Sequence, residues 1–119
     1  MNASKVEFCS YSKGEDMLLY NLYDFLLSLH TLYWTSDRIY KKELAKITKL
    51  SRLDFDYIFS NLHKSKFFIY EPYNTIKIFP FRIVRIGEIL KACQNGDFEP
   101  LRQFAYEYGF LTKGGDKNA

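Results

Sequence analysis

The chain has 119 residues, enough for one small domain with a modest core and too few for two. Its 47% hydrophobic and 26% charged residues are ordinary for a globular domain, but aromatic residues reach 18%, which predicts an aromatic-rich core with some rings at the surface. The net charge of +3 permits nucleic-acid binding without requiring it. No apolar run is long enough to span a membrane, and we expect a cytoplasmic protein without a secretion signal.

The first predicted helix begins at Ser12 and continues to about residue 33, because Ser12 and Glu15 have capping-box spacing. Upstream, residues 6–8 are expected to form a short strand that could pair with a later hairpin. Two adjacent apolar stripes follow the helical period: Leu18, Leu22, Phe25, Leu29 and Leu32, beside Leu19, Tyr23, Leu26 and Tyr33. A helix that is apolar around so much of its circumference is either the central helix of the domain or half of a dimer interface, and we favour the central helix.

Residues 40–79 predict two short helices followed by a hairpin. Residues 41–50 (KKELAKITKL) form a basic helix in this interpretation, with Ile39, Tyr40, Leu44 and Ile47 facing inward. Residues 51–65 form a second helix with Ser51 as its N-cap and Asp54 in the position of the capping-box acid. Its buried positions are predicted to be Phe55, Ile58, Phe59 and Leu62. Residues 67–70 and 75–79 then predict two strands joined by a turn at residues 71–74.

Residues 43–52 (ELAKITKLSR) resemble the helix-turn-helix core of winged-helix proteins, especially those of phage and plasmid replication proteins and small transcriptional regulators. In that pattern a small residue lies where the helices cross, here Ala45, and a hydrophobic residue, here Leu50, ends the turn before the Ser51 cap. The resemblance covers about a third of the chain. Two positions depart from it: Lys49 and Lys66 stand where the family usually has glycine with positive φ, which costs another residue about 1 to 2 kcal/mol.

The remaining residues predict two more helices. Residues 82–94 form a helix that ends at Asn95-Gly96, with Ile83, Ile86, Leu90 and Cys93 inward. Asp97 caps a last helix over residues 98–108, which Gly109 ends, with Leu101, Phe104 and Tyr108 inward. Residues 112–119 are a polar tail predicted to be disordered, which leaves a single domain over residues 1–111. The predicted fold is therefore mostly α with a small β-hairpin: a winged helix-turn-helix with a long N-terminal helix and two C-terminal helices.

The resemblance implies binding of double-stranded DNA, with the helix of residues 51–65 in the major groove and lysines of the preceding helix and the hairpin on the backbone. Helical spacing points Leu53, Tyr57, Ser60, Asn61 and Lys64 away from the core. The predicted DNA-binding residues are Lys41, Lys42, Lys46, Lys49, Arg52, Tyr57, Ser60, Asn61, Lys64, Lys66, Tyr73, Asn74 and Lys77. Asp54 and Asp56 count against this interpretation, because two carboxylates in the first turn of that helix repel phosphates.

The sequence is compatible with two functions. The first is a DNA-binding transcriptional regulator or replication accessory of a mobile element. It would form a homodimer through the helix of residues 14–33 or through the C-terminal helices. The second is a protein-interaction module on the same scaffold, which exposed rings among Tyr57, Tyr70, Tyr73, Phe81 and Tyr106 would favour.

The sequence does not predict an enzyme. Cys9 and Cys93 lack metal-ligand spacing, and His30 and His63 are far apart, with His30 inside an apolar helix and His63 expected at the surface. Glycines occur singly or in the tail, so no phosphate-binding loop is present. No nucleophile and base are recognisable as a set. We therefore expect no catalytic site, no metal and no cofactor.

Overall fold

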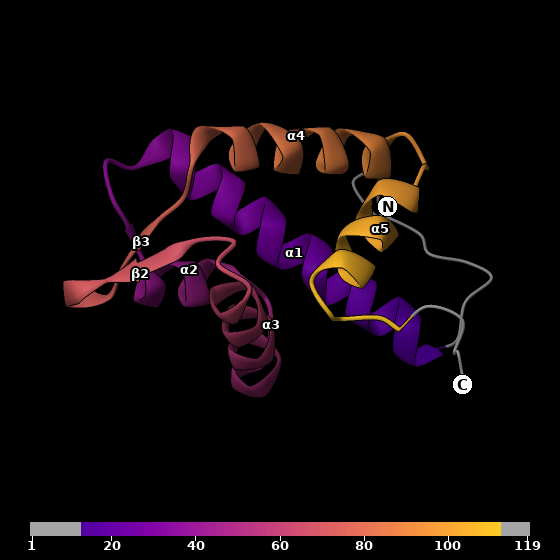
Figure 1. Ribbon diagram of the computed structural model, residues 1–119, viewed down its shortest axis with the longest axis horizontal. Coiled ribbons are helices and arrows are strands. Elements are labelled where there is room, and N and C mark those ends of the chain that lie inside the picture. Colours follow the sequence, from indigo (N-terminus) through magenta and orange to yellow (C-terminus); the bar gives the residue numbers. More distant parts are fainter. Residues whose placement is uncertain (1–12, 113–119) are drawn as a thin grey trace.

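The computed structural model describes residues 13–112, which form five α-helices and a small antiparallel sheet (Figure 1). In chain order the elements are α1 (Lys13–Thr35), β1 (Ile39–Tyr40), α2 (Lys41–Ile47), α3 (Arg52–Lys64), β2 (Ile69–Glu71), a 3₁₀ turn (Pro72–Asn74), β3 (Thr75–Lys77), α4 (Pro80–Gln94) and α5 (Glu99–Glu107). The predicted mostly α fold with a long N-terminal helix is confirmed. The predicted strand at residues 6–8, the Ser12 cap and residues 113–119 of the predicted tail lie outside the described residues.

The long helix α1 is the centre of the domain. Its contacts extend to α2, α3, α4 and α5, and Figure 1 shows it crossing the molecule between α4 and the α2–α3 pair. Both predicted apolar stripes are buried along most of their length, and only Leu18 and Tyr33 at the ends stay partly accessible. This burial is the environment expected for a helix that is apolar on most of its circumference.

The sheet has the order β1-β3-β2, with β3 paired to both neighbours. Residues 39 and 40, predicted to face inward beside the following helix, form a strand, which confirms the inward position of Ile39 and corrects that of Tyr40. Because side chains alternate along a strand, Ile39 is buried while Tyr40 points outward and is 38% exposed. The short helix α2 then has Leu44 as its buried apolar residue, and Ile47 at its end is 43% exposed.

The hairpin strands are shorter than predicted. Phe67 and Phe68 precede β2 and are fully buried, and Ile78 follows β3 and is buried as well. These side chains enter the core from the ends of the hairpin. The apolar run at residues 67–70 therefore reflects the burial of Phe67 and Phe68 in the core, and only its last two residues belong to β2.

Three helix ends share one hydrogen-bonding pattern, the Schellman motif, in which a residue with positive φ follows the helix. After α3 that residue is Lys66, with φ 60°, and the Phe67 amide donates to the Leu62 carbonyl at 2.9 Å. After α4 and α5 it is Gly96 (φ 88°) and Gly109 (φ 81°), as the sequence predicted. The matching bonds join Asp97 to Ala92 at 2.8 Å and Phe110 to Ala105 at 2.7 Å.

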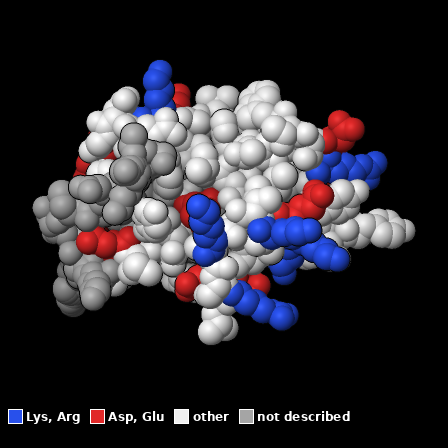
Figure 2. All heavy atoms as spheres, turned by 180° about the vertical axis from the view of Figure 1, so that it is seen from behind, with Lys and Arg blue, Asp and Glu red and all other residues white. Residues whose placement is uncertain are grey.

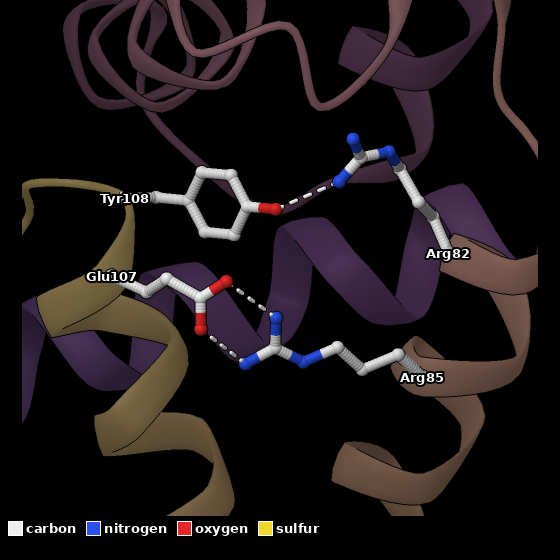
Figure 3. A network of polar contacts seen from close by, with 4 residues as sticks. All are labelled: Arg82, Arg85, Glu107 and Tyr108. Carbon is white, nitrogen blue, oxygen red and sulfur yellow. Dashed lines mark hydrogen bonds and ion pairs between the residues drawn. The ribbon is translucent and has the colours of Figure 1, made fainter.

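A polar network holds α5 against α4 (Figure 3). The Arg85 guanidinium donates to both carboxylate oxygens of Glu107 at 2.8 and 2.9 Å. Arg82 donates to the Tyr108 hydroxyl at 2.8 Å and lies over the Phe67 ring. The predicted inward residues of both helices are buried, apart from Tyr108, which is partly buried against the core. This side of the molecule is thus fixed by an ion pair and a hydrogen bond above an apolar layer.

Candidate nucleic-acid interface

The turn between α2 and α3 is tied to the central helix. The Lys49 amide donates to the Asp24 carboxylate of α1 at 2.8 Å, and the Thr48 hydroxyl donates to the Ala45 carbonyl at 3.1 Å. Ser51 caps α3 as predicted, because its hydroxyl accepts the Asp54 amide at 3.1 Å. These bonds fix the direction in which α3 leaves the turn.

Two details of the turn differ from the winged-helix pattern. Ala45 is exposed, so it does not lie at a close crossing of α2 and another helix, and this expectation was wrong. Lys49 does not have positive φ, so the turn avoids the strain that glycine would have relieved there. Leu50 is partly buried against the core, which agrees with its expected place at the end of the turn.

Helix α3 has the predicted two faces. Phe55, Ile58, Phe59 and Leu62 are buried. Leu53, Ser60 and Lys64 are exposed on the opposite face, while Asn61 is half-buried. Tyr57 is 47% exposed, and its ring packs nearly perpendicular to that of Phe110, with centroids 5.7 Å apart. The accessible face of α3 thus combines a large apolar side chain at its start with hydroxyl, amide and ammonium groups.

An aromatic cluster, formed by Phe59, His63, Phe68 and Tyr70, joins the hairpin to α3. Phe59 lies 4.9 Å from Phe68 and 5.2 Å from Tyr70 between ring centroids. The Lys41 ammonium lies 4.5 Å from the Phe59 centroid, a cation–π distance. Of the predicted lysines, Lys41 is therefore half-buried and held by rings of its own chain. Sequence patterns did not reveal this cluster, because its members come from α3 and from β2 with the segment that leads into it.

The hairpin tip carries two residues with positive φ, Tyr73 (66°) and Asn74 (61°). The Tyr70 hydroxyl donates to the Asn74 side-chain oxygen at 2.6 Å, and the Thr75 hydroxyl donates to the Pro72 carbonyl at 3.0 Å. Tyr73 is 90% exposed and projects from a backbone that these bonds hold in place. Asn74 is thus partly engaged within the hairpin.

Positive charge is concentrated in the segment that forms α2, α3 and the hairpin. Residues 41–77 include eight Lys or Arg and four Asp or Glu, whereas the rest of the chain has nine and ten. Lys42, Lys46, Lys49, Lys66 and Lys77 are all exposed. In Figure 2, basic side chains gather toward the side of the molecule that bears α2, α3 and the hairpin, with acidic side chains between them. Arg52 lies 3.9 Å from Asp56, an exposed contact that offsets part of its charge.

An open groove of about 590 Å³ lies beside this surface, between the end of α1 and the sheet. Tyr33 and Trp34 form one wall, and Arg38, Glu71 and Lys77 contribute charged groups of both signs. Among the described residues, no three His, Cys, Asp or Glu side chains are grouped as metal ligands. None of the described helices is long and apolar enough to cross a membrane.

Comparison of the chain with protein-family models, curated proteins and solved structures finds no match.

Proposed function

We infer that this chain is a winged helix-turn-helix protein that binds double-stranded DNA, with α3 as the recognition helix and β2–β3 as the wing. The observation that carries the proposal is the excess of four positive charges over residues 41–77, against an excess of one negative charge elsewhere. A duplex presents closely spaced phosphates, so clustered exposed lysines are the feature that binding requires. The order α2, α3, hairpin and the polar outer face of α3 also support it.

In this arrangement α3 would enter the major groove, where Ser60 and Lys64 can reach base edges or phosphates and Leu53 can contact a thymine methyl group. Exposed Lys42 and Lys46 of α2 would pair with the backbone beside that groove. Lys77 and Tyr73 would contact the neighbouring backbone from the hairpin. The resemblance to small regulators and replication proteins of mobile elements favours one of those two roles.

The test is fluorescence anisotropy of a random-sequence duplex at several salt concentrations. The variant Lys42→Ala/Lys46→Ala/Lys64→Ala removes three charges from the proposed interface. If each lysine contacts a phosphate, the slope of log affinity against log salt should fall by about 2 to 3. The matched control, Val84→Glu/Lys91→Glu, lowers the net charge by the same amount on α4, where both positions are exposed.

Retained affinity in the α4 control with loss in the triple lysine variant would support the interface. Equal loss in both variants would show that only overall charge matters and would refute this placement. Absence of binding even at low salt would refute DNA binding altogether.

A second candidate function is protein binding through the start of α3. Leu53 is 82% exposed, and Asp54 and Asp56 beside it are exposed carboxylates. An apolar side chain flanked by acids suits a basic, partly apolar protein surface better than a phosphate backbone. If DNA binding fails, comparing the proteins captured by the wild type with those captured by a Leu53→Lys variant tests this alternative.

A further inference from the structure

The outer face of α1 lacks the charge that the other helices have. Over residues 17–35 this helix contains no Lys or Arg, and Asp24 is its only carboxylate. Each of the helices α2 to α5 has at least three charged residues within its bounds. The Asp24 oxygens already accept hydrogen bonds, from the Lys49 amide at 2.8 Å and from the Ser28 hydroxyl at 3.4 Å. Apart from this one carboxylate, which is already engaged within its own chain, the accessible side of α1 over residues 17–35 is therefore a strip without charged side chains in a protein that is 26% charged.

The accessible positions of this strip are spaced like one face of a helix pair. They fall at residues 17, 20, 24, 27, 31 and 34, with alternating steps of three and four, the spacing of the contact positions in two-stranded coiled coils. Met17 is 56% exposed, Tyr20 46%, Leu27 38% and Trp34 66%. At 1.5 Å per residue the strip is about 26 Å long.

We propose that this strip of α1 (Met17, Tyr20, Asp24, Leu27, Thr31 and Trp34) is a homodimer interface that pairs with the same strip of a second copy. Charge complementarity selects this partner. The other helices would place at least three charged residues each against a largely apolar surface, whereas a twofold axis sets the strip against itself with Asp24, already hydrogen-bonded within its own chain, as the one charged group from each copy. A face without basic groups cannot pair with phosphates, so it is unsuited to binding DNA. The proposal does not depend on the proposed function.

The area of the strip fits a weak dimer. Large apolar side chains have on the order of 200 Å² of accessible surface each. The exposed fractions of the four apolar residues therefore correspond to roughly 400 Å² in each copy. With the polar positions between them, two copies would bury about 1,000 Å², the lower limit for a specific interface. Dissociation in the micromolar range is the expected result.

Sedimentation equilibrium of the full chain from low to several hundred micromolar tests the interface. The wild type should show a reversible monomer–dimer equilibrium. Leu27→Glu and Thr31→Glu should each raise the dimer dissociation constant at least about tenfold, because either change sets carboxylates against each other or against Asp24 of the second copy. The matched control Val84→Glu places the same charge on an exposed apolar position of α4 and should dimerise like the wild type.

Trp34, the single tryptophan of the chain, gives a second readout. Its emission should shift to shorter wavelength as the wild type is concentrated, and this shift should be absent in the Thr31→Glu variant. Circular dichroism shows whether the variants stay folded. Thr31 is exposed, so its variant remains informative even if Leu27→Glu destabilises the domain. A wild type that is monomeric at all concentrations would refute the interface. So would a Val84→Glu variant weakened as much as the two α1 variants.

Discussion

Replacing Lys66 by glycine should stabilise this protein although it removes a side chain. Lys66 has φ 60° in the Schellman motif that ends α3, the place that Gly96 and Gly109 occupy after α4 and α5. A side chain in the left-handed region costs about 1 to 2 kcal/mol. Glycine also increases the conformational entropy of the unfolded chain, which lowers the free energy of unfolding by about 0.4 to 1 kcal/mol. The net gain in the free energy of unfolding is about 0.5 to 1 kcal/mol.

For a domain of this size, that gain should raise Tm by about 2 to 5 °C in a thermal unfolding experiment. The control is Lys49→Gly, which removes the same exposed charge from a residue without positive φ. Lys49 has no strain for glycine to relieve, so the variant only gains conformational entropy in the unfolded chain. It should therefore be less stable than the wild type by about 0.4 to 1 kcal/mol. If Lys66→Gly raises Tm and Lys49→Gly lowers it, the backbone conformation at residue 66 is the cause of the difference. If Lys66→Gly lowers Tm as much as Lys49→Gly does, the argument from strain is wrong.

Three further outcomes are expected. Glu107→Gln should lower the free energy of unfolding by about 1 kcal/mol at neutral pH, because it breaks the ion pair with half-exposed Arg85. Hydrogen bonds from Arg85 lower the pKa of Glu107, so the difference between variant and wild type in urea unfolding should vanish as the pH falls through that lowered pKa. Burial lowers the pKa of His30, so acidification below the ordinary histidine pKa should lower the free energy of unfolding. Because His30 accepts the Trp34 indole N–H at 3.2 Å, its protonation should also change tryptophan emission, and the His30→Gln variant should show no such change in emission with pH. Burial raises the pKa of Cys93 to about 12, so alkylation mapped by mass spectrometry should leave this thiol unmodified until the protein is denatured.

Helix positions were predictable because periodic burial follows from local sequence. The buried faces of α3 and α4 were correct at every named residue, and the Ser51 cap and the glycines after α4 and α5 were correct as well. Such features depend on residues within one or two turns of each other. The element types that failed were those decided by distant partners.

Residues 39 and 40 illustrate this limit. Nothing near Ile39 marks it as a strand, since its pairing with Ile76 joins positions far apart in the chain. Lys41 is another case: its basic neighbours favoured a phosphate contact, but the Phe59 and Tyr70 rings that hold it come from α3 and β2. The exposure of Ala45 was equally invisible, because it depends on how α2 packs as a whole. Helical spacing alone predicted which residues lie on the outer face of α3, but it could not predict which residues of other elements lie beside that face.

Backbone strain in the described residues is concentrated around the proposed DNA-binding surface. The non-glycine residues with positive φ are Lys66, Tyr73 and Asn74, all at the end of α3 or in the hairpin. The same chain places glycine in the same geometry after α4 and α5, so strain is not a general property of its helix ends. Such strain persists only where the surrounding structure holds the backbone, and strained residues cluster at functional sites. A lysine and a nearly fully exposed tyrosine at these positions are groups that contact phosphates and nucleic-acid backbones. If the proposed function is right, the stabilising change Lys66→Gly should therefore weaken duplex binding, which links the strain to the proposed function by a measurable trade-off.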